Sequence, residues 1–196
     1  MLTIIKDIKI NDATTKKLLK YVNPIFADAV DVSGIANFSC EQLAIPLIAE
    51  AKNEAVVIGT LSMNQVSLQT SDLLGQILTI AGGSPRGTVM TIHPTKIILQ
   101  RGVLRYDDMQ IDVGDNPINF EGAIGLDKSL DMTVTLPYTT EGRTVRVGGA
   151  TRGSRIVLPL KGTVDKPLLD TDKLLELQLK QQGEELLRRG LEEIFK

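Results

Sequence analysis

INFEGAIGLDKSLDMTVTL, residues 118–136, alternates apolar and polar side chains on both sides of the turn-like sequence Asp127-Lys128-Ser129. Successive side chains of a β-strand point to opposite faces, so the two halves predict a pair of amphipathic strands. The connection between them is too short for a crossover, which makes the pair antiparallel. This stretch therefore predicts a hairpin with one apolar face and one polar face.

The same alternation extends outward from this hairpin in both directions. It recurs at residues 156–164, in shorter runs between residues 97 and 113, and at the start of the chain. It also recurs from Val56 to Leu68, where a phase slip near Gln65 predicts a β-bulge. Because no helix of ten residues lies between the later strands, the sequence predicts an antiparallel meander and argues against a parallel sheet.

Amphipathic helical patterns supply the cover for the apolar face of this sheet. Two short covering helices are expected at about residues 12–29 and 71–81. A longer apolar stripe predicts a C-terminal helix at residues 171–196, which needs a surface to pack on. The expected fold is α+β and predominantly antiparallel β, a curved, groove-like meander sheet of residues 1–170 with flanking helices and the C-terminal helix.

Composition excludes several classes of function. The chain has 196 residues, a net charge of −2, one His and one Cys. A lone Cys cannot form a disulfide within the chain, and one His with one Cys cannot build a Cys/His zinc cluster. The charge balance argues against a nucleic-acid-binding protein held by counterion release. We expect no metal, no cofactor and no nucleic-acid partner.

The residues that could bind phosphate, bind a metal or act in catalysis do not occur in the motifs that these functions require. Gly82 and Gly87 lack the Lys that a phosphate-binding loop requires, and neither His93 nor Cys40 stands beside a recognisable catalytic partner. The acidic cluster of residues 107–115 lacks EF-hand spacing, and its carboxylates are interpreted as solvated. Arginines of the loop at 142–153 suit phosphate or lipid headgroups, although a solvated loop is the favoured interpretation. We expect no catalytic residue, while an enzyme whose site is assembled through space remains an alternative.

The apolar face of the later strands is the candidate binding surface. Its side chains are almost all aliphatic, which suits acyl chains and lacks the aromatic platforms that stack sugars or bases. The alternative is that the helices seal this face and make it an ordinary core. The candidate lipid-binding residues are Ile118, Phe120, Ile124, Leu130, Met132, Val134, Ile156, Leu158 and Leu160.

Two segments resemble the C-terminal region of AsmA-like proteins, the group that includes TamB. They are GAIGLDKSLDMTVTLP at residues 122–137 and LPLKGTVDKP at residues 158–167, the latter followed by an amphipathic helix. Residues 102–114 fit the repeated strand pairs of that group, and residues 18–46 resemble its large planctomycete-type members. These motifs are short and structural, so they indicate architecture more than function.

The resemblance implies a non-enzymatic protein of the cell envelope. It implies an apolar β-groove on the periplasmic side of the inner membrane that serves phospholipid transfer or envelope maintenance. Its partners would be a phospholipid or another acyl-chain lipid, and a membrane or envelope protein. No apolar run of about 18 residues is present, so the membrane anchor of the family is missing and we expect a C-terminal piece of a longer chain. The alternative is a sealed structural or protein-interaction module without a ligand.

Overall fold

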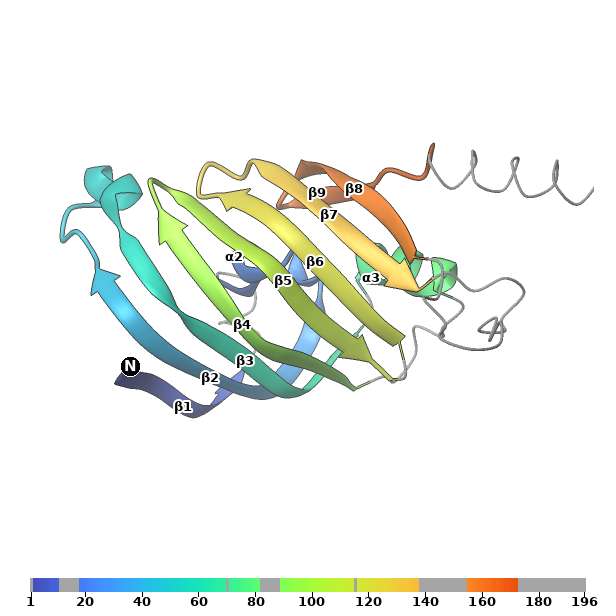
Figure 1. Cartoon of the computed structure of the whole chain (residues 1–196), viewed down its shortest axis with the longest axis horizontal. Helices are drawn as coiled ribbons and strands as arrows, with labels where there is room; N and C mark the ends of the chain where they lie inside the picture. Colours follow the sequence, from blue (N-terminus) through green and yellow to red (C-terminus); the bar gives the residue numbers. More distant parts are fainter. Residues whose placement is uncertain are drawn as a thin grey trace, which may run out of the picture.

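The computed structural model describes residues 2–10, 18–69, 71–81, 89–114, 116–137 and 155–172. They form a single curved, open, antiparallel sheet of nine strands, in which each strand pairs with its neighbours in the sequence (Figure 1). This confirms the predominantly antiparallel meander. The strands are β1 (Leu2–Ile10), β2 (Val30–Ala44), β3 (Val56–Gln69), β4 (Met90–Gln100), β5 (Val103–Val113), β6 (Asn116–Gly125), β7 (Leu130–Pro137), β8 (Arg155–Thr163) and β9 (Lys166–Leu169).

The expected bulge lies in β3. The pairing of β3 with β4 shifts register between Leu61 and Met63 and again between Met63 and Val66. Gln65 between them adopts a φ of 52°, a left-handed conformation that bends the strand. The shift keeps Met63 and Val66 both buried, so the phase slip seen in the sequence preserves the apolar face.

The first covering segment, expected at about residues 12–29 with an interruption at Asn23-Pro24, is broken at that point. Its described part consists of α2 (Lys20–Val22) and the 3₁₀-helix η2 (Pro24–Phe26). The break falls at Asn23, whose φ of −151° and ψ of 134° are extended. A residue before proline is pushed out of the helical region, so Pro24 accounts for the break. Residues 12–17 lie outside the described part of the chain.

The second covering segment, α3 (Asp72–Ile80), confirms the helix expected at about residues 71–81. The buried Ser71 caps it, because its hydroxyl accepts a hydrogen bond from the Leu74 amide at 3.1 Å. Ile77 and Leu78 of this helix are fully buried against the sheet. The C-terminal helix predicted at residues 171–196 lies outside the described residues except for residues 171 and 172.

Both covers lie on the same side of the sheet. α2 contacts β6, while α3 contacts β9 and η2. In Figure 1 they lie behind the later strands, whereas the 3₁₀-helix η3 (Ala49–Glu54) lies at one end of the molecule, between β2 and β3. The covered area is therefore concentrated over β5–β9. None of the described helices is long and apolar enough to cross a membrane.

Candidate functional site

The nine candidate lipid-binding residues share one face of β6, β7 and β8. Phe120 pairs with Val134, and Val134 pairs in turn with Leu158, which sets three of them in a row across the sheet. All except the half-buried Leu130 are at most 3% exposed. The structure therefore brings the predicted residues together.

These side chains pack against the covering segments. Ile25, Phe26 and Ile77 of the covers belong to the same apolar cluster as the nine sheet residues. An acyl chain can reach this part of the sheet only if α2, η2 and α3 move away from it. Their role in lipid binding thus remains a prediction, and in this structure they form the core.

A buried polar contact fastens the cover to the sheet. The side-chain amide of Asn23 donates a hydrogen bond to the Tyr106 hydroxyl at 3.3 Å, and its oxygen accepts one from the Ile25 amide at 3.1 Å. Asn23 is fully buried, and burial raises the pKa of Tyr106 far above its ordinary value. Lys20 of α2 adds an ion pair with Asp165 at 2.5 Å.

The apolar face continues beyond this cover, toward the end where β2 joins β3. Leu43, Val57 and Leu99 are successive register partners on β2, β3 and β4. Val57 lies four residues before the buried Leu61 on β3, and Leu99 lies two residues after the buried Ile97 on β4. Both belong to the same face as those residues, yet both are only half-buried. The face that is sealed over β6–β8 is therefore partly open over β2–β4.

A hollow of about 430 Å³ lies at this open end. Eight of its nine lining residues are apolar, and the ninth, Lys52, supplies an ammonium group. Such a lining can receive a hydrocarbon chain and pair with an anionic group at its outer end. The lining residues are Ile45, Pro46, Leu47, Ile48, Lys52, Ala55, Val57, Leu99 and Leu126.

Sequence reasoning missed this hollow. Residues 43–46 are mostly apolar, which is typical of a strand, but β2 ends at Ala44 and the chain turns into η3. The available signal was the uninterrupted apolar run of residues 45–48 directly before the charged segment 50–54. A strand with one polar face alternates apolar and polar side chains, so four consecutive apolar residues are unusual in it.

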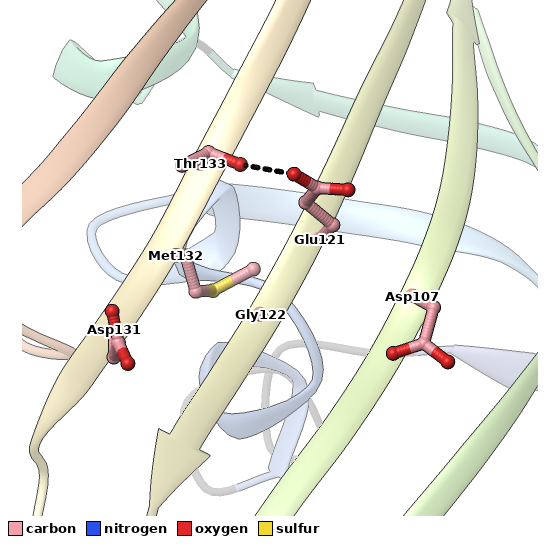
Figure 2. A pocket seen from close by; sticks show the side chains of 6 residues that line it. All are labelled: Asp107, Glu121, Gly122, Asp131, Met132 and Thr133. Atoms are coloured by element: carbon pink, nitrogen blue, oxygen red, sulfur yellow. Dashed lines mark hydrogen bonds between the residues drawn. The ribbon is translucent and has the colours of Figure 1, made fainter.

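A second hollow of about 290 Å³ lies on the opposite, polar face of the sheet (Figure 2). Asp107, Glu121 and Asp131 reach it from three neighbouring strands. The Thr133 hydroxyl donates a hydrogen bond to Glu121 at 3.0 Å. All three carboxylates are exposed, and the described residues contain no group arranged to hold a metal ion. These carboxylates are solvated, and for Asp107 this agrees with the interpretation of the acidic cluster at residues 107–115.

A β-bulge explains part of that acidic surface. The pairing of β5 with β6 shifts between Tyr106 and Met109, which leaves Asp107 and Asp108 exposed side by side. The remaining acidic residue of the cluster in the described chain, Asp112, lies further along β5. Asp115 falls outside the described residues.

Asp112 pairs with His93, a contact that the sequence did not reveal. His93 Nε2 lies 2.6 Å from the Asp112 carboxylate, which also accepts a hydrogen bond from Gln110 at 2.7 Å. The Gln110 hydrogen bond, and then the His93 contact, hold the pKa of Asp112 below its ordinary value. Both partners are about one-third or more exposed on the polar face, so the pair is a surface contact of β4 with β5.

The single thiol is buried and hydrogen-bonded. Cys40 Sγ lies 3.1 Å from the Gln42 carbonyl oxygen, at the place where β2 shifts register against β3. Cys40 is therefore a packing residue of the sheet.

Comparison with protein-family models, with curated proteins and with solved structures finds no match for this chain.

Proposed function

We propose that this chain is a non-enzymatic lipid-binding module, and that it forms the C-terminal part of an AsmA-like protein of the cell envelope. It would act on the periplasmic side of the inner membrane, in phospholipid transfer or envelope maintenance. The acyl chain would bind at the open end of the apolar sheet face. The observation that carries this proposal is the apolar hollow over Val57 and Leu99, where the aliphatic face extends past its cover.

The chemistry of the hollow supports an acyl chain over other ligands. Its volume falls within the range of about 300–1,000 Å³ that small-molecule sites occupy. Each buried methylene contributes about 0.8 kcal/mol, so a chain of a few carbons gives useful affinity. Lys52, an exposed residue of the lining, can pair with the phosphate or carboxylate of the ligand, while the apolar lining offers nothing to a sugar or a nucleotide.

A titration with a fluorescent fatty acid tests the proposal on the delipidated chain. Leu99→Glu places a charge in the hollow, and we expect affinity to fall about tenfold or more because the carboxylate must be desolvated. Leu99 packs against the margin of the core but is only half-buried, so we expect the substituted chain to fold. Thermal unfolding by circular dichroism confirms that the variant is folded.

Val157→Glu is the matched control. Val157 is 44% exposed on β8 and has no place in the hollow, so its variant carries the same added charge and should bind like the parent chain. If the parent chain does not bind the fatty acid, or Leu99→Glu binds as well as Val157→Glu, the proposed site is wrong.

A sealed structural or protein-interaction module is the second candidate. It is favoured by the burial of the predicted residues under α2, η2 and α3. It predicts that no phospholipid is extracted from the purified chain and that no fatty acid binds. Val134 cannot serve to separate the two candidates, because it is fully buried and a charge there would unfold the sheet.

A further inference from the structure

The connection from β2 to β3 carries an exposed apolar tip, which we define as Leu43 and residues 45–48. Leu47 is 103% exposed, Ile48 67% and Ile45 64%. No residue of the tip is charged. In Figure 1 this connection and η3 form an end of the molecule beyond the sheet. A contiguous apolar patch of this kind marks a surface that contacts a protein or a membrane.

The shape of the tip favours a membrane. A leucine side chain that is as exposed as an isolated residue projects from the surface, so Leu47 forms a convex point. A protein partner must offer a matching pocket to bury such a point, whereas lipid chains rearrange around it. Pro46 restricts the backbone beside Leu47 and lowers the entropic cost of presenting the side chain.

The charges around the tip indicate how it would bind. Glu41 forms an ion pair with Lys96 at 3.0 Å, and hydrogen bonds from Ser129, with a smaller contribution from the charge of Lys52, lower the pKa of Asp127. The charged side chains near the tip include more acidic than basic groups. Their summed charge is therefore not positive, and an anionic membrane surface would not attract the tip. These side chains are Glu41, Glu50, Glu54, Asp127, Lys52, Lys96 and Arg101.

We propose that the apolar tip inserts into the interfacial layer of a phospholipid bilayer and acts as a peripheral anchor. Insertion is driven by apolar burial and not by charge. It places the mouth of the hollow, which Ile45, Leu47 and Ile48 also line, at the membrane surface. This inference stands apart from the proposed lipid-chain site, since a tip can insert whether or not the hollow takes a ligand.

A tryptophan at the tip tests insertion directly, because the chain has no Trp. We expect Leu47→Trp emission to shift to the blue on mixing with phosphatidylcholine vesicles, and to be quenched by brominated acyl chains. Leu168→Trp is the matched control: Leu168 is 59% exposed on β9, away from the tip, and its emission should not change. Unchanged emission from Leu47→Trp in the presence of vesicles would overturn the proposal.

Vesicle co-sedimentation measures the contribution of the tip. Leu47→Glu should reduce the partition coefficient about tenfold or more, the factor that burial of one leucine provides, while Leu168→Glu leaves it unchanged. Binding should persist in high salt and need no anionic lipid. Binding that requires anionic vesicles and is lost in high salt would overturn the proposal in favour of an electrostatic surface.

Two further experiments distinguish insertion of the tip into a bilayer from binding in the hollow and from dimerisation. Leu99→Glu should weaken fatty-acid binding but leave vesicle binding intact, which distinguishes the hollow from the tip. Sedimentation velocity without lipid should show a monomer. A dimer that Leu47→Glu dissociates would identify a second copy of the chain as the occupant and overturn the bilayer.

Discussion

Replacing Asn23 by alanine should loosen the cover over the apolar face. The substitution removes three contacts at once: the hydrogen bond to the Tyr106 hydroxyl, the bond accepted from the Ile25 amide, and a contact with Met109 Sδ at 3.6 Å. The Tyr106 hydroxyl then loses the group that donates to it and keeps its own long contact to Met132 Sδ at 3.8 Å. The substitution therefore removes the side-chain hydrogen bond that links the start of η2 to β5.

The magnitude follows from the two hydrogen bonds. Loss of a side chain that caps a helix costs about 1 kcal/mol. A buried hydroxyl deprived of its partner costs about 1–3 kcal/mol more. We therefore expect the free energy of unfolding to fall by about 2–4 kcal/mol. For a chain of this size the melting temperature should drop by about 4–16 °C.

Urea unfolding followed by circular dichroism measures this loss, and a hydrophobic dye reports whether the apolar face has opened. Asn119→Ala is the control, because Asn119 donates to Asp108 on the polar surface at 3.2 Å and should cost less than about 0.5 kcal/mol. The double variant with Tyr106→Phe completes a cycle, with an expected coupling of about 1 kcal/mol. Strict additivity in that cycle, or a loss no larger than that of the control, would refute the reasoning.

Two more perturbations test the sheet. Gly122→Ala should destabilise the chain by about 3 kcal/mol or more, because Gly122 has a φ of 133° and a Cβ there would overlap the Asp131 carbonyl oxygen; an unchanged melting temperature would contradict this close approach. Lys128 and Lys20 lower the pKa of Asp165 from 3.8 to about 2, so the ion pairs stabilise the fold above pH 3.8 and this contribution is lost as the pH falls toward 2. Asp165→Asn should therefore flatten the pH dependence of the urea midpoint between these values, and an identical slope in the two proteins would count against it.

The strands could be predicted because their signal is local. Alternation along residues 118–136 identifies two strands and their apolar face without knowledge of any other segment, and the φ of Gln65 confirms a bulge that was visible as a phase slip. The same pattern cannot say what covers that face. Whether Phe120 is sealed depends on η2 and α3, which lie on it only after the whole sheet has formed.

The candidate site could not be predicted, since it depends on where the cover stops. The pairing of His93 with Asp112 needs the register of β4 against β5, which the sequence leaves open. The apolar run at residues 45–48 illustrates a different limit. Hydrophobicity normally predicts burial, but here the strand ends at Ala44, and Ile45, Leu47 and Ile48 stay largely exposed where they line the hollow.

The order of the strands has a consequence for folding during synthesis. Each strand pairs with the strand made just before it, so every hairpin can close soon after it is translated. The covering segment of α2 and η2 cannot dock as early. Asn23 bonds to Tyr106, which is synthesised 83 residues later, and Lys20 pairs with Asp165, which is synthesised 145 residues later. Ile25 and Phe26 are thus among the first buried residues to be synthesised and among the last to pack against the sheet. Until β5 and Asp165 have been made, α2 and η2 lack these contacts to the sheet, and a chaperone or a membrane then has the best access to the apolar face.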